Sequence, residues 1–267
     1  MVGVYINFSS FKILMKINLF LLYRGFLKVL KTFQHKSNMS LRERDQVIDT
    51  GLRSYMLSVY NYMASGLTLT GAVAMLIASS PTLIQVFFGT GLHWIIMFLP
   101  IILVLFLSVR LHKMSVESVK IIFWSYSILM GISLSSVFLL YTGESIARTF
   151  FITAATFISM SLYGYTTKKN LLSWSSFLFM GIIGICLCSI INIFIGSTAL
   201  QFVISGAGVL IFTGLTAYDT QNIKHAYCLH DNTMESSKKA IFGALQLYLD
   251  FINIFIMMIQ FFNINRD

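Results

Sequence analysis

Long apolar runs separated by short polar connections dominate the chain from residue 57 to residue 262. Each run is close to the ~20 residues that an α-helix needs to cross a hydrocarbon core of about 30 Å. Open strands would leave backbone groups unpaired in lipid, and barrel strands would be about half as long and would alternate. The pattern predicts transmembrane helices at 57–78, 93–109, 120–141, 146–166, 173–195, 200–218 and 240–262.

Composition leads to the same fold class. Of the 267 residues, 57% are hydrophobic and 11% are charged, whereas a soluble domain carries about a quarter charged residues. Too little polar surface is available to cover a water-soluble globule, and the connections are too short to fold alone. We therefore predict an all-α polytopic membrane protein, a seven-helix bundle embedded in the lipid bilayer.

Positive charge is distributed unevenly among the predicted loops. The net charge of +9 would suggest nucleic acid on a soluble protein, but here loops rich in Lys and Arg alternate with loops that have no excess of them. Such loops lie on the cytoplasmic side, so we expect no nucleic-acid partner, a cytoplasmic N-terminus and an outside C-terminus. The positive loops contain Arg110, Lys113 and Lys120, then Lys168 and Lys169, then Lys224, Lys238 and Lys239.

Residues 1–48 differ from the membrane domain predicted at 49–267. Lys12, Lys16 and Arg24 belong to a basic helical face among apolar residues, which is typical of a helix lying on an anionic membrane surface. A signal peptide is one alternative, although no small-residue cleavage site follows an apolar core. In the other alternative, translation starts at Met39.

The last predicted span carries one polar stripe. Steps of three, four and seven residues place its members on a single helical face, and a polar stripe avoids lipid, so we place this helix at the centre of the bundle. A carboxylate in the middle of a span is by default functional, with a hydrogen bond between helices as the alternative. The stripe consists of Gln246, Asp250, Asn253 and Gln260.

The sixth span ends in a second carboxylate, Asp219. If this span faces the last helix, Asp219 and Asp250 share a proton, because two adjacent carboxylates resist double ionisation. Deprotonated, the pair suits Ca²⁺, and protonated it forms a neutral hydrogen-bonded latch. We expect both residues to act as pH sensor, gate and Ca²⁺ site, with Arg110 of the second span pairing with Asp219. Alternatively, Asp219 faces solvent and Arg110 only anchors its helix.

Four stretches strongly resemble the Bax inhibitor-1 family, in particular its bacterial YccA-like branch. The resemblance extends from Asp49 to the end of the chain. The stretches are DTGLRSYMLSVYNYMASGLTLTG (49–71), YTGESIARTFFITAATFISMSLYGYTTKKNL (141–171), GVLIFTGLTAYDTQNIK (208–224) and LQLYLDFINIF (245–255).

The resemblance implies a seven-helix bundle with a central last helix that acts as a pH-sensitive Ca²⁺ leak. It also implies a di-aspartyl sensor, matching Asp219 and Asp250, latched by an arginine that matches Arg110. The second predicted span departs from some members, since it contains Pro100 and no acid.

The sequence leaves three functions open. The first is a proton-regulated leak for Ca²⁺ in a bacterial inner membrane, without a cofactor. The second is a non-conducting regulator that binds other membrane proteins, such as a membrane protease. The third, an intramembrane hydrolase, is disfavoured because the five His residues lie in loops or at span ends and no catalytic motif has a credible context. We therefore expect no enzyme.

Overall fold

The computed structural model describes residues 41–89, 92–228 and 231–263, and within these ranges all regular secondary structure is helical. Six of the helices are long and apolar enough to cross a membrane. A seventh, α4, has 19 residues with Pro100 inside it. The fold class predicted from the sequence is thus confirmed. The elements are α2 (Leu41–Ala78), α3 (Pro81–Phe88), α4 (Leu92–Arg110), η1 (Leu111–Lys113), α5 (Val116–Leu140), α6 (Gly143–Thr166), η2 (Leu171–Trp174), α7 (Ser175–Ile195), α8 (Thr198–Ala226) and α9 (Thr233–Asn263).

The first part of the bundle differs from the predicted spans in two ways. Helix α2 begins at Leu41, so residues 41–48 continue into the first span without a break, whereas the predictions for residues 1–40 lie outside the described residues. The connection after α2, which the sequence suggested was a loop, contains the short helix α3. Pro81 begins this helix, a position where a missing backbone N–H costs nothing.

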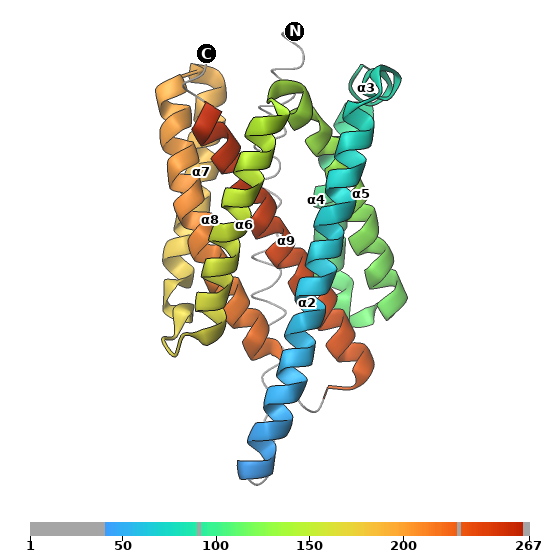
Figure 1. The fold of residues 1–267 in the computed structure, drawn as a ribbon, viewed down its shortest axis with the longest axis vertical. Helices are drawn as coiled ribbons and strands as arrows, with labels where there is room; N and C mark the ends of the chain where they lie inside the picture. The colour runs from blue at the N-terminus through green and yellow to red at the C-terminus, as the bar shows by residue number, and fades with distance from the viewer. Residues whose placement is uncertain (1–40, 90–91, 229–230, 264–267) are drawn as a thin grey trace.

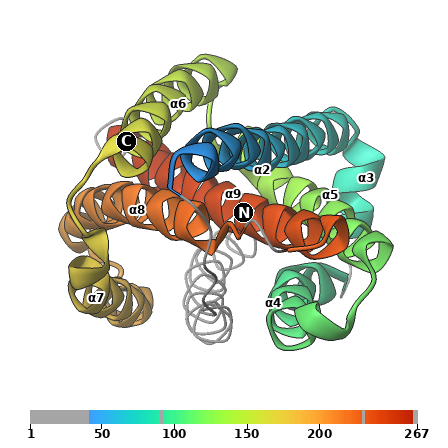
Figure 2. The ribbon, with the colours of Figure 1, turned by 90° about the horizontal axis from the view of Figure 1, so that it is seen from below.

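Helix α9 is at the centre of the bundle, as the polar stripe predicted. Every residue from Lys239 to Gln260 is buried. Figure 2 shows α9 running through the middle of the helices, with α2, α5, α6 and α8 against it. Figure 1 shows that α9 crosses the bundle obliquely.

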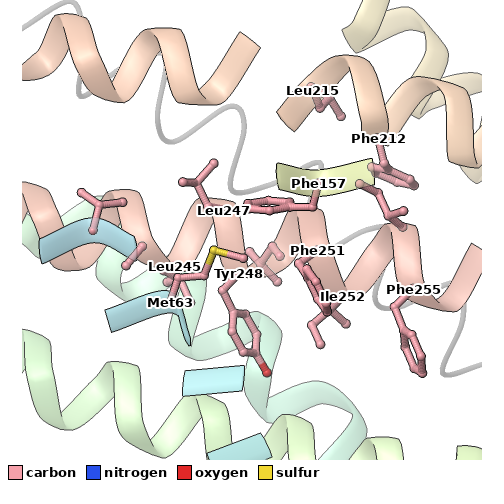
Figure 3. Packing of buried hydrophobic residues seen from close by; sticks show 14 of the residues in the cluster. Met63, Phe157, Phe212, Leu215, Leu245, Leu247, Tyr248, Phe251, Ile252 and Phe255 are labelled. Atoms are coloured by element: carbon pink, nitrogen blue, oxygen red, sulfur yellow. The ribbon is translucent and has the colours of Figure 1, made fainter. Parts of the chain in front are cut away.

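Aromatic rings fill the space around α9 (Figure 3). Phe157 of α6 packs against Phe251 with ring centroids 5.7 Å apart, and Tyr126 of α5 packs against Tyr248 at 5.8 Å. Because lipid tails are as apolar as these side chains, contacts of this kind stabilise the bundle through van der Waals packing rather than through the hydrophobic effect.

Helices α6 and α8 approach each other closely at a glycine. A Cβ atom at Gly164 of α6 would overlap the backbone carbonyl of Ala217 on α8. Backbone atoms cannot move aside as a flexible side chain can, so Gly164 sets the separation of the two helices.

Candidate functional site

The two aspartates predicted to form a pair meet inside the bundle. Asp250 of α9 is fully buried and Asp219 of α8 is 4% exposed. The two carboxyl groups lie next to each other, close enough to form a hydrogen bond when one of them is protonated.

The contact depends on two features that hydropathy did not indicate. Helix α8 continues to Ala226, about two turns beyond the end predicted at residue 218. Asp219 is therefore deep in its helix rather than at its end. Asp250 lies far from the start of α9, and α9 crosses the bundle obliquely (Figure 1).

Most oxygens of the pair lack a donor within the part of the chain that the structure describes. Among the described residues, neither oxygen of Asp250 nor Oδ1 of Asp219 has a hydrogen-bond donor. An ionised carboxylate only accepts hydrogen bonds, so a bond between two carboxyls requires a proton on one of them.

The remaining members of the polar stripe are buried and only partly satisfied. Asn253 donates from Nδ2 to the carbonyl of Leu249 at 2.7 Å, but its Oδ1 has no donor among the described residues, and the same is true of Oε1 of Gln246. Unsatisfied oxygens therefore lie on three successive turns of α9, at Gln246, Asp250 and Asn253. Buried polar atoms of this kind call for water or an ion.

Gln260 belongs to a separate cluster near the other end of α9. Its Oε1 accepts a hydrogen bond from Nε2 of Gln201 on α8 at 2.7 Å, and Gln201 also donates to Ser205 at 3.2 Å. This part of the stripe therefore links α8 to α9 through side-chain amides.

Asn222 is a buried polar residue of α8 that the sequence analysis did not single out. It is buried one turn after Asp219 on α8, and its Nδ2 has no acceptor in the described part of the chain. The spacing of three residues from Asp219 was a usable signal. It was overlooked because the predicted span ended at residue 218.

Arg110 does not join the pair in this structure. Its side chain is exposed at the end of α4, with the guanidinium 5.8 Å from the centre of the Phe106 ring. The ion pairs of the described residues do not include it. The physical reason is position: α4 packs on α5 at the edge of the bundle (Figure 2), whereas Asp219 is buried on α8, which packs on α9. The expected ion pair with Asp219 is therefore not formed.

The end of α8 is fixed by hydrogen bonds that the sequence did not predict. Gln221 accepts from the backbone N–H of Leu171 and donates to the carbonyl of Lys169, both at 2.8 Å. Lys224 donates to the carbonyl of Tyr165 at 2.8 Å. These contacts satisfy backbone groups at the end of α6 and in the connection to α7, and they fix the end of α8 that follows Asp219.

The polar side chains of the pair and the stripe offer oxygen ligands rather than a cluster typical of a transition metal. The described residues contain no group of three His, Cys, Asp or Glu side chains able to hold a metal. Two carboxylates and the amide oxygens of Gln246 and Asn253 are oxygen ligands, which Ca²⁺ prefers with water completing its shell.

Comparisons with known proteins extend over nearly the whole described structure. A family model described as "Inhibitor of apoptosis-promoting Bax1" matches residues 52–267. An uncharacterised protein of Rickettsia prowazekii is 42% identical over 233 residues, covering 87% of this chain and 99% of that protein. The inner membrane protein YbhL of Escherichia coli K12 is 43% identical over 81% of this chain and 94% of its own length. An uncharacterised membrane protein of Streptococcus pyogenes is 32% identical over 81% of this chain and 95% of its length.

Proposed function

This chain belongs to the Bax inhibitor-1 family of membrane proteins, and on that premise we propose that it is a proton-regulated leak for cations, with Ca²⁺ as the ion that passes. We place it in a bacterial inner membrane, because the similar YbhL is named as an inner membrane protein. The single observation that carries the proposal is the contact between the carboxyls of Asp219 and Asp250 in the centre of the bundle.

The pair acts as a gate because its strength depends on its proton content. With one proton, an O–H group donates to a carboxylate, a charge-assisted hydrogen bond of the strong kind that holds α8 to α9. Without a proton, two negative charges repel each other inside the membrane and attract a cation. With two protons, the charge that strengthens the bond is lost. The leak is therefore lowest where the pair holds one proton.

The stripe on α9 supports an ion path next to the gate. Gln246, Asp250 and Asn253 offer unsatisfied oxygens on successive turns, over a length of about 10 Å at the rise of a helix. Oxygens at this spacing replace part of the water shell of a hard cation. The path is closed in the described conformation, since all three side chains are buried.

Ion flux into liposomes tests the proposal. Liposomes containing the purified protein are loaded with a Ca²⁺ dye, and the external pH is stepped in both directions. Wild type should leak faster than empty liposomes and should show a pH of minimal leak. Asp219→Asn and Asp250→Asn should remove the alkaline rise, because an amide donor needs no titrating proton.

Two further variants make the flux test specific. Glu144→Gln removes an exposed carboxylate that pairs with Arg148 on the surface of α6, and it should leave the profile unchanged. Arg110→Ala tests whether the arginine acts in a conformation other than the described one. If wild type leaks no faster than empty liposomes at any pH, the channel proposal is wrong, and a non-conducting regulator of other membrane proteins takes its place.

A further inference from the structure

A pocket of about 670 Å³ lies between α2 and α6, separate from the aspartate pair. The lining residues recur every three or four positions, so each helix contributes one continuous face. From α2 come Arg53, Met56, Leu57 and Tyr60, and from α6 come Phe157, Ile158, Ser161, Leu162 and Tyr165.

The pocket opens toward the surroundings of the bundle and is closed toward its core. Along its rim, Leu57 is 52% exposed, Ile158 63% and Leu162 60%. At its floor, the hydroxyls of Tyr60 and Ser161 lie 2.6 Å apart and bridge the two helices. In a membrane, an apolar opening of this kind faces the acyl chains of lipids.

Positive charge gathers at one end of the pocket. Helices α2 and α6 are antiparallel (Figure 1), so Arg53 and Tyr165 are at the same end. The guanidinium of Arg53 takes part in neither ion pair of the described residues, and the pocket lining contains no acidic residue. The ammonium of Lys224, which is outside the pocket lining, lies 4.9 Å from the centre of the Tyr165 ring and adds positive charge near that end.

An apolar groove with cations at one end matches one kind of lipid. We propose that this pocket binds an anionic glycerophospholipid, with an acyl chain between α2 and α6 and the headgroup phosphate on Arg53. Arginine binds phosphate through two parallel N–H donors. The distance from Arg53 to Tyr60 along α2 is about 10 Å, roughly a third of the hydrocarbon core. The pocket therefore holds the part of an acyl chain nearest the headgroup, and its volume is in the range of small-molecule sites.

Native mass spectrometry of the full chain in detergent tests this site, with phosphatidylglycerol and phosphatidylcholine of the same acyl chains as probes. Wild type should retain phosphatidylglycerol more strongly than phosphatidylcholine. Arg53→Gln should lower that preference by about fivefold, the effect expected of one basic residue at an anionic lipid surface. Leu57→Trp should fill the groove and weaken the binding of both lipids.

Two matched controls separate the pocket from general lipid contact. Lys168→Gln removes an exposed cation outside the pocket lining, and Leu210→Trp enlarges a side chain that is 75% exposed on α8. Both should retain lipid as wild type does. Equal retention of the two lipids by wild type, or equal losses in Arg53→Gln and Lys168→Gln, would overturn the proposal. The same is true if a co-purified protein occupies the groove and Leu57→Trp releases it without changing lipid retention. Since retention is read without ion flux, failure of the leak proposal does not affect this test.

Discussion

The hydroxyl of Tyr248 on α9 lies 2.7 Å from the hydroxyl of Thr70 on α2. Thr70 donates its own proton to the carbonyl of Ser127 on α5 at 2.9 Å, so Tyr248 is the donor in the first bond. Tyr248 precedes Asp250 by two residues and points to nearly the opposite side of α9. The central helix is thus joined to α2 and α5 on one side and to α8 on the other.

This donor order predicts an asymmetry between two conservative substitutions. Tyr248→Phe removes one hydrogen bond but leaves Thr70 satisfied by Ser127, and it should cost about 1 kcal/mol. Thr70→Val leaves the buried Tyr248 hydroxyl without its acceptor. It should therefore lower the free energy of unfolding by more, about 1–3 kcal/mol. Thermal unfolding in detergent measures both changes. Thr68→Val is the matched control, because Thr68 is exposed and bonds only within its own helix. Equal losses for the first two variants would contradict the donor order.

At residue 250, we expect the stability of a variant to depend on whether the new side chain can donate a hydrogen bond to Asp219, rather than on its size. Asp250→Asn keeps a donor for Asp219 and should lower the unfolding temperature only slightly near neutral pH. Asp250→Leu leaves the Asp219 carboxyl buried without its partner and should cost several kcal/mol, on the order of a broken buried pair. Unfolding followed across pH distinguishes them. Near-identical curves for Asn and Leu would show that the carboxyl contact contributes little.

Gly164 should not tolerate a methyl group. In Gly164→Ala the new Cβ overlaps the Ala217 carbonyl, so α6 and α8 must separate, at a cost of about 1–3 kcal/mol. Gly184→Ala is the control, since no atom lies within 4 Å of the Cβ position there. Alanine stabilises a helix relative to glycine by up to about 1 kcal/mol, so this variant should be neutral or slightly more stable. We expect the unfolding temperature to fall in Gly164→Ala and to stay the same or rise slightly in Gly184→Ala.

Gln221 should protect the backbone of the connection between α6 and α7 from hydrogen exchange. Gln221→Ala removes the acceptor of the Leu171 N–H and the donor to the Lys169 carbonyl, so hydrogen exchange at Leu171 should speed up. Gln221→Glu keeps an acceptor for Leu171 but loses the donor, and exchange at Leu171 should stay closer to wild type. If both variants exchange alike, Gln221 is not what protects this amide.

The sequence predicted the helices, the central position of α9 and the stripe that faces inward, because each depends on local periodicity and on the exclusion of polar groups from lipid. Hydropathy failed at the end of α8. Thr220, Gln221 and Asn222 are polar, so the predicted span stopped before them, yet all three are buried. Tertiary hydrogen bonds satisfy at least Thr220 and Gln221. Hydropathy averaged along one helix cannot detect hydrogen-bond partners that lie on another helix.

The position of Arg110 shows a second limit. Loop charge identified it as a residue at a helix end, and the family resemblance suggested a pair with Asp219. Which way such a side chain turns depends on where α4 packs, and α4 lies against α5. The hydroxyl links of Tyr248 to Thr70 and of Tyr60 to Ser161 were missed for a related reason. Single Tyr, Ser and Thr residues give no periodic signal in an apolar span.

The complete enclosure of α9 also bears on how the protein is made. Helix α9 follows α2 to α8 in the chain, so it reaches the membrane after the helices that surround it. A charged Asp at the centre of a lone helix costs about 2.5–3.5 kcal/mol at insertion, and Asp219 has no partner on α9 until that helix is inserted. The contacts that bury α9 against α2, α5, α6 and α8 therefore form only after the last helix has been synthesised.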